Sequence, residues 1–199
     1  MNKKESAFEK IKFVIVIAIF VVIFLVYFNH LSNNSSKRKA KVEKSEIEIL
    51  TGYDMVNDYP KTPRDVVKLH CKFMKTLYKT KDISDEELVV LNQQVRNLYS
   101  SELLKYNPEN DNLVDLKKNI QKTKDEGYTY QMYELPEASQ VTQYTKDSVE
   151  YATLEVALTV DTSDGKGYVY ERYVLIKENN QWKIHVWGPV PADEVEGEK

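Results

Sequence analysis

The feature that most constrains the fold is an unbroken run of 16 apolar residues, from Phe13 to Phe28. Ile11 and Leu31 extend this run to about 20 residues, the length that an α-helix needs to cross a bilayer. A cleavable signal peptide is the alternative, because it also combines a basic start with an apolar stretch. Its stretch is usually shorter and ends in small residues, whereas this run ends in bulky ones and has no cysteine nearby to carry a lipid. We therefore predict an uncleaved membrane anchor.

The lysines around this run indicate its orientation. Basic residues flank both ends of the run, so their number does not decide its orientation in the membrane. The N-terminal lysines adjoin the apolar run, however, and long C-terminal domains are translocated largely regardless of charge. We expect residues 1–12 in the cytoplasm, a transmembrane helix over 13–31, a polar linker over 32–58, a folded domain over 59–190 and an acidic tail over 191–199. The chain would then be a single-pass protein of the cell membrane with an extracytoplasmic C-terminal domain.

The charge distribution and the cysteine content exclude several kinds of site. Residues 1–44 carry 9 Lys or Arg against 3 Asp or Glu, and the remainder carries 19 against 28. An acidic domain of this kind is not a nucleic-acid-binding surface, which needs clustered Lys and Arg. Cys71 is the single cysteine, so an intramolecular disulfide is impossible and a cysteine-built zinc site is disfavoured. The domain has to be stable through its core.

Three helices are predicted in the first half of the domain. Thr62 can cap a helix that starts at Pro63, and its apolar residues recur at intervals of three and four as far as Lys79. Ser84 and Glu87 have the spacing of a capping box, and that helix continues or restarts until Pro108. A third helix fits residues 111–126, with Gly127 at its end.

The apolar period then changes from three or four residues to two. Every second residue from Ala152 to Val160 is apolar, which indicates a half-buried strand. Further strands fit residues 139–145, 168–177 and 182–186, the last with Trp182, Ile184 and Val186 on one face. Turns at 161–167 and at Asn179-Asn180 join them. Helices followed by hairpin-linked strands predict an α+β domain in which helices pack on one face of an antiparallel sheet.

Several segments resemble a known family. They are Tyr59-Pro60-Lys61-Thr62-Pro63-Arg64-Asp65-Val66-Val67-Lys68-Leu69, Asp85-Glu86-Glu87-Leu88, Glu102-Leu103-Leu104-Lys105-Tyr106-Asn107-Pro108 and Trp182-Lys183-Ile184. Together they resemble an uncharacterised family of single-pass membrane proteins from low-GC Gram-positive bacteria, itself similar to the nuclear transport factor 2-like superfamily. The resemblance implies a cone-shaped domain whose curved antiparallel sheet wraps a long N-terminal helix, in a bacterial envelope. It implies no activity, because this architecture hosts many functions.

The resemblance also implies a pocket between the first helix of the domain and the concave sheet, which His70 and Tyr78 would line. Isomerases of the superfamily use an Asp base with a Tyr, but no catalytic residue can be carried onto a position of this chain. His30, His70 and His185 lack the spacing of metal ligands, and Cys71 fits a small buried side chain. We expect no metal and no cofactor, and the sequence favours binding over catalysis.

The combined prediction is an envelope protein whose domain binds another protein as a scaffold. In outline it resembles the subunits of type IV secretion machines that join one N-terminal helix to a cone domain. Tyr170, Tyr173 and Trp187 are the candidate interface residues, and a homodimer through the sheet is a further expectation. The alternative is a small-molecule sensor or an enzyme. A deep pocket with converging polar groups would favour a ligand, and a cavity filled by Phe73, Met74 and Trp182 would favour a scaffold.

Overall fold

The computed structural model describes residues 44–80, 82–162, 165–191 and 194. The predicted cytoplasmic end and transmembrane helix, His30, and nearly all of the acidic tail lie outside these residues. Within the described part of the chain, no helix is both long enough and apolar enough to cross a membrane. Residues 44–199 form a compact unit of their own.

The helices begin where the capping signals are. They are α2 (Glu46–Thr51), α3 (Pro63–Lys79), α4 (Asp85–Arg96), α5 (Ser101–Tyr106) and α6 (Glu109–Asp125). The Thr62 hydroxyl accepts a hydrogen bond from the Asp65 amide at 3.1 Å, and Pro63 occupies the first turn of α3. Ser84 and Glu87 form the predicted capping box at the start of α4. The predicted starts of α3 and α4 are therefore confirmed.

The sheet has five antiparallel strands, and it confirms the α+β class. They are β1 (Thr129–Glu134), β2 (Thr142–Lys146), β3 (Val149–Thr162), β4 (Gly165–Glu178) and β5 (Gln181–Pro189), in the order β1-β3-β4-β5. β2 pairs with the N-terminal part of β3, and β1 pairs with its C-terminal part. The predicted strand over 139–145 is shifted, because Ala138–Gln140 form a 3₁₀ turn before β2. β1 was not predicted.

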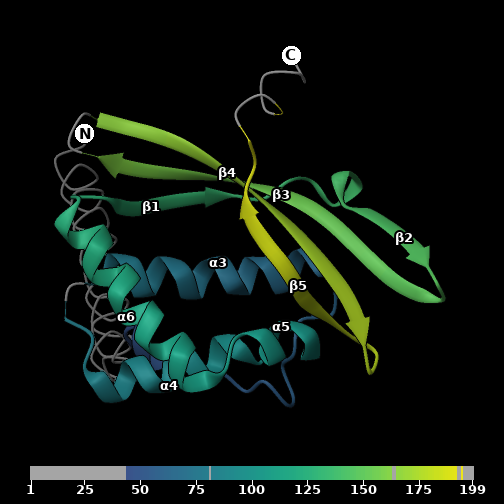
Figure 1. The fold of residues 1–199 in the computed structure, drawn as a ribbon, viewed down its shortest axis with the longest axis horizontal. Coiled ribbons are helices and arrows are strands. Elements are labelled where there is room, and N and C mark those ends of the chain that lie inside the picture. The colour runs from purple at the N-terminus through teal and green to yellow at the C-terminus, as the bar shows by residue number, and fades with distance from the viewer. Residues whose placement is uncertain (1–43, 81, 163–164, 192–193, 195–199) are drawn as a thin grey trace, which may run out of the picture. The chain divides into compact units, whose positions relative to one another are not determined.

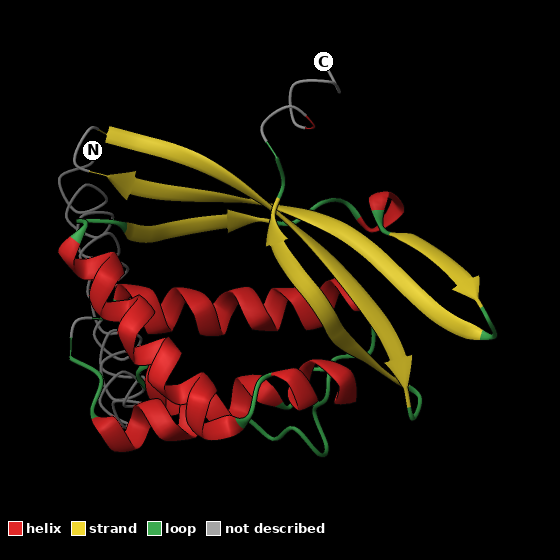
Figure 2. Ribbon diagram, viewed as in Figure 1, coloured by secondary structure: helices red, strands yellow, loops and turns green. Residues whose placement is uncertain are grey.

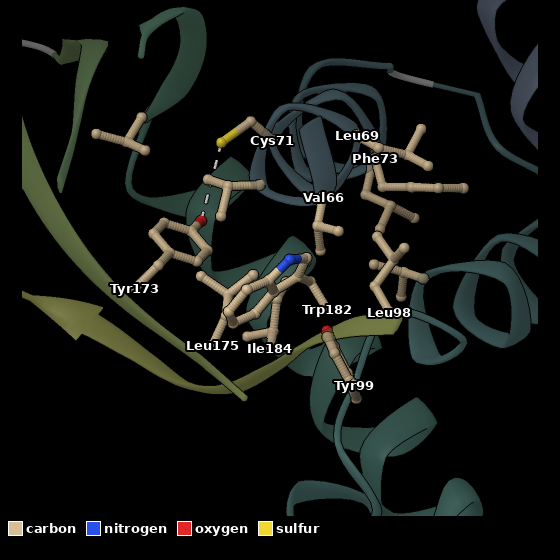
Figure 3. Close-up of a cluster of buried hydrophobic side chains, with 14 of the residues drawn as sticks. Val66, Leu69, Cys71, Phe73, Leu98, Tyr99, Tyr173, Leu175, Trp182 and Ile184 are labelled. Carbon is tan, nitrogen blue, oxygen red and sulfur yellow. Dashed lines mark hydrogen bonds between the residues drawn. The ribbon is translucent and has the colours of Figure 1, made fainter. Parts of the chain in front are cut away.

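Helices α3, α4, α5 and α6 lie on one face of the sheet (Figures 1 and 2). α3 runs along this inner face, where its Val66 and Phe73 share the core with Leu175 and Ile184 of the sheet (Figure 3). Beyond α4 the chain extends the edge of β5, because Leu98 and Ser100 exchange backbone hydrogen bonds with Ile184 at 2.7 and 2.8 Å. This contact ties the helical layer to the sheet.

The structure places a helix inside the range 32–58 that the sequence analysis assigned to a polar linker. Ser45 and Glu48 form a capping box at the start of α2, and Leu50 is fully buried. The Gln94 side chain of α4 donates to the Thr51 and Tyr53 carbonyls at 3.2 and 3.0 Å. A helix of six residues is too short to show an apolar period, so its signal in the sequence is its cap alone.

Candidate functional site

A pocket of about 250 Å³ opens between α3, β1 and the inner face of the sheet. α3 contributes Cys71, Met74, Lys75 and Tyr78, and β1 contributes Tyr130, Met132 and Tyr133. Leu158, Glu171, Tyr173 and Trp187 of the longer strands and Asn119 of α6 complete the lining. Five of the lining residues are aromatic, and the acidic one is Glu171. The volume lies below the range of about 300–1,000 Å³ that is usual for ligand pockets, so only a small ligand fits.

Two β-bulges place aromatic side chains in this pocket. Tyr130 and Tyr133 are three residues apart and would face opposite sides of a regular strand. The register of β1 against β3 shifts between Tyr130 and Met132, which leaves Gln131 as an extra residue and lets both tyrosines line the pocket. The pairing of β4 with β5 shifts in the same way, with His185 as the extra residue.

The second bulge corrects the predicted face of β5. Trp182 and Ile184 lie inward as expected, but Val186 is half exposed and pairs with Val174 on the outer face. Trp187 lies inward instead, with its ring centroid 4.9 Å from that of His70. The inserted residue shifts the alternation by one position, so residues after His185 have exchanged faces.

Glu171 brings a carboxylate into this largely aromatic pocket. It lies two residues before Tyr173 on the inner face of β4, and the Tyr173 hydroxyl donates a hydrogen bond to its Oε2 at 3.0 Å. Burial raises the pKa of Glu171 above its usual range, and the Tyr173 hydrogen bond opposes this shift. Within the described part of the chain, the Glu171 carboxylate is in no ion pair.

A buried hydrogen-bond chain continues from Tyr173 into the core. His70 Nδ1 lies 3.1 Å from the Tyr173 hydroxyl, and His70 Nε2 lies 3.4 Å from the Tyr99 hydroxyl. Because Tyr173 gives its proton to Glu171, the directions are consistent when His70 Nδ1–H donates to Tyr173 and Tyr99 donates to Nε2. Burial lowers the pKa of His70 to about 3, so the ring is neutral at physiological pH. The chain fixes the orientation of Glu171.

Cys71 lies beside this chain, with its Sγ 3.9 Å from the Tyr173 hydroxyl (Figure 3). Its side chain is buried, as the apolar pattern of α3 predicts. Burial raises the pKa of the thiol to about 12, which keeps it protonated. A protonated thiol is a poor nucleophile, so Cys71 does not supply a reactive group to the pocket.

The predicted site residues are divided among the pocket, the core and the outer face. Tyr78 lines the pocket, whereas His70 is fully buried behind Tyr173. Tyr173 is also fully buried, so its assignment to an exposed interface is corrected: it lies on the same face as Leu175, under α3. Trp187 is corrected too, because the bulge turns it inward. Tyr170 alone of the three interface candidates lies on the outer face.

Glu171, Tyr130 and Tyr133 were not predicted as site residues from the sequence. Glu171 could have been found from the alternation along β4, because it shares a face with Tyr173 and Leu175. The two tyrosines carry no such signal, since a bulge separates them. In the part of the chain that is described, no three His, Cys, Asp or Glu side chains gather where they could hold a metal ion.

The outer face of the sheet carries exposed apolar side chains. Tyr168 is 70% exposed, Val186 50%, Tyr144 45% and Tyr170 37%. Between Tyr170 and Val186 lies Arg172, which pairs with Glu155 and Glu194 at 2.7 Å each. This face therefore has two apolar areas with an ion-pair group between them.

Comparisons with known proteins give a family and two structural likenesses. A family model described as a domain of unknown function (DUF6715) matches residues 1–187. The solution structure of the transfer protein TraH from the Gram-positive conjugative plasmid pIP501 is similar at 12% identity and a TM-score of 0.37, over 70% of this chain and 99% of that one. The intermembrane space region of the chloroplast protein ARC6 is similar at 12% identity and a TM-score of 0.30, over 67% and 100%. No curated protein matches this sequence.

Proposed function

Because this chain belongs to DUF6715, a family described as a domain of unknown function, we propose a role from its own residues. It is a membrane-anchored domain that binds another protein of the cell envelope. The proposal includes a single-pass anchor over residues 13–31 and an extracytoplasmic domain, in the envelope of a Gram-positive bacterium. It also includes a nuclear transport factor 2-like origin of the domain. The apolar run and the family resemblance of the sequence support these parts.

The outer face of the sheet is the observation that carries this proposal. Tyr168 and Tyr170 are neighbours on the outward side of β4, next to Thr159 and Ala157 of β3. Tyrosine combines a large apolar ring with a hydroxyl group, and it is enriched in protein interfaces. An exposed apolar area beside a charged group, here Arg172 with its two glutamates, has the composition of an interface core with a polar rim.

The test uses cross-linking in intact cells, with a C-terminal tag on the full chain and mass spectrometry of the proteins recovered from the membrane. The double variant Tyr168→Ala/Tyr170→Ala is expected to lose a partner that the wild type recovers in near-stoichiometric yield. Tyr106→Ala is the matched control, because Tyr106 is 71% exposed but belongs to α5 in the helical layer. Equal recovery by the double variant and the wild type would refute the proposal, and recovery of this chain alone would identify the partner as a second copy.

A second function, the binding of a small molecule, is favoured by the pocket. Phe73 and Trp182, which were expected to fill the cavity of a pure scaffold, are buried in the core away from the pocket lining. Met74 lines the pocket but leaves about 250 Å³ open. The polar groups of Glu171 and Tyr173 converge there, as in a ligand site.

A further inference from the structure

We propose that the pocket between α3, β1 and β4 binds a small organic cation, whose ammonium group faces the Glu171 carboxylate and the surrounding aromatic rings. This inference rests on the small-molecule function and is independent of the outer face.

The carboxylate of Glu171 favours a cationic ligand. A carboxylate that is removed from water needs hydrogen bonds or an opposite charge to remain ionised. Tyr173 supplies one hydrogen bond, to Oε2, and no cation of the described residues pairs with either oxygen. Lys72 of α3 pairs with Glu46 at 3.0 Å and does not line the pocket. A bound ammonium group would supply the positive charge that no described residue pairs with the Glu171 carboxylate.

The aromatic lining of the pocket also favours a cation. The rings of Tyr78 and Tyr130 are 5.1 Å apart between centroids, and those of Tyr173 and Trp187 are stacked at 6.5 Å. Tyr133 adds a fifth aromatic side chain. The face of an aromatic ring attracts cations, and cages of such rings bind methylated ammonium groups. Rings together with one carboxylate select a cation over a neutral molecule of the same shape.

Lys75 is the cationic residue of the pocket lining. Its side chain is half-buried, and a lysine stem can lie along an apolar wall while the ammonium group reaches solvent. The long-range field favours cations, since residues 45–199 carry 19 Lys or Arg against 28 Asp or Glu. An anionic ligand would meet both this field and Glu171.

The inference includes a pH dependence. The titratable groups that line the pocket with Glu171 are Tyr173 on its own strand, Cys71, Lys75 and Tyr78 on α3, and Tyr130 and Tyr133 on β1. Burial raises the pKa values of Cys71 and Tyr130 to about 12, so neither gains a charge near neutral pH. Protonation of Glu171, whose pKa is also raised, removes the carboxylate. Cation affinity should therefore fall as the pH falls through this raised pKa.

The experiment follows methionine methyl signals by NMR, with the full chain in detergent micelles. Met74 lines the pocket and Met55 does not, so the Met55 methyl group is the internal reference. The probes are choline with its uncharged isostere 3,3-dimethylbutan-1-ol, and benzylamine with benzyl alcohol and benzoate. At least one cation is expected to shift the Met74 signal with about tenfold higher affinity than its neutral isostere.

Glu171→Gln keeps the shape of the side chain and should abolish this preference. Glu134→Gln, on an exposed residue of β1, is the matched control and should preserve it. Equal binding of cation and isostere, or a preference that survives Glu171→Gln, overturns the cation inference while leaving a ligand pocket in place. Absence of any Met74 shift with every probe, the neutral and anionic ones included, overturns the inference together with the small-molecule function.

Discussion

The buried imidazole of His70 makes the stability of the domain depend on pH in a calculable way. Burial lowers the pKa of His70 to about 3, against an ordinary value of 6.5. Below pH 6.5 the unfolded state therefore binds a proton on His70, whereas the folded state does not bind this proton until about pH 3. The contribution of the neutral His70 ring to the free energy of unfolding is fully present above pH 6.5 and is lost progressively as the pH falls. Each pH unit in this window costs about 1.4 kcal/mol, so acidification from pH 7.5 to 5 should cost about 2 kcal/mol.

Urea unfolding of residues 44–199, followed by the fluorescence of Trp182 and Trp187, measures this loss. The reference is His70→Gln, which can hydrogen-bond but cannot be charged. Glu171 acts with the opposite sign, because its raised pKa adds stability as the pH falls. Both proteins contain Glu171, so the difference between their two curves isolates His70. A wild-type curve that runs parallel to that of His70→Gln between pH 7.5 and 5 would show that the imidazole is not buried in its neutral form.

Other substitutions test the remaining parts of the structure by the same urea unfolding. Tyr173→Phe should cost about 1–3 kcal/mol, because it leaves buried partners without their hydrogen bond, and it should raise the pKa of Glu171 further. Leu50→Ala should cost about 2–5 kcal/mol whereas Ile49→Ala, at an exposed position of α2, should cost far less; equal effects would mean that α2 is not packed on the domain. Asn180 has a φ of 63°, so Asn180→Ala should destabilise the β4–β5 turn by about 1 kcal/mol and Asn180→Gly should not.

The parts of the fold that were predictable are those with a local physical cause. The Thr62 and Ser84 caps determine where α3 and α4 begin, because each hydroxyl satisfies an amide that the helix leaves free. Asn179 and Asn180 both adopt positive φ in the tight turn between β4 and β5, a conformation that asparagine tolerates better than most residues. These signals involve residues within four positions of one another and can be read from the sequence directly.

The parts that could not be predicted depend on partners far apart in the sequence. Leu50 lies in a segment that looks like a linker, and its burial becomes evident only when α4 packs beside α2. β1 has alternation on either side of Gln131 but not across it, so its period is invisible in a run of six residues. Val186 and Trp187 are adjacent and both apolar, and the pattern alone does not show which of them faces inward.

The two bulges together explain why the candidate site differs from its prediction. A regular β5 would place Trp187 on the outer face beside Arg172, where the sequence analysis sought an interface. The extra residue His185 transfers this indole to the inner face, against His70 and Tyr99. The extra residue Gln131 likewise gives the inner face two tyrosines where a regular strand would give one. One-residue insertions have therefore moved aromatic surface from the outside of the sheet to a pocket whose acidic residue is Glu171. This redistribution is the reason that the structure favours a small-molecule site as a second function.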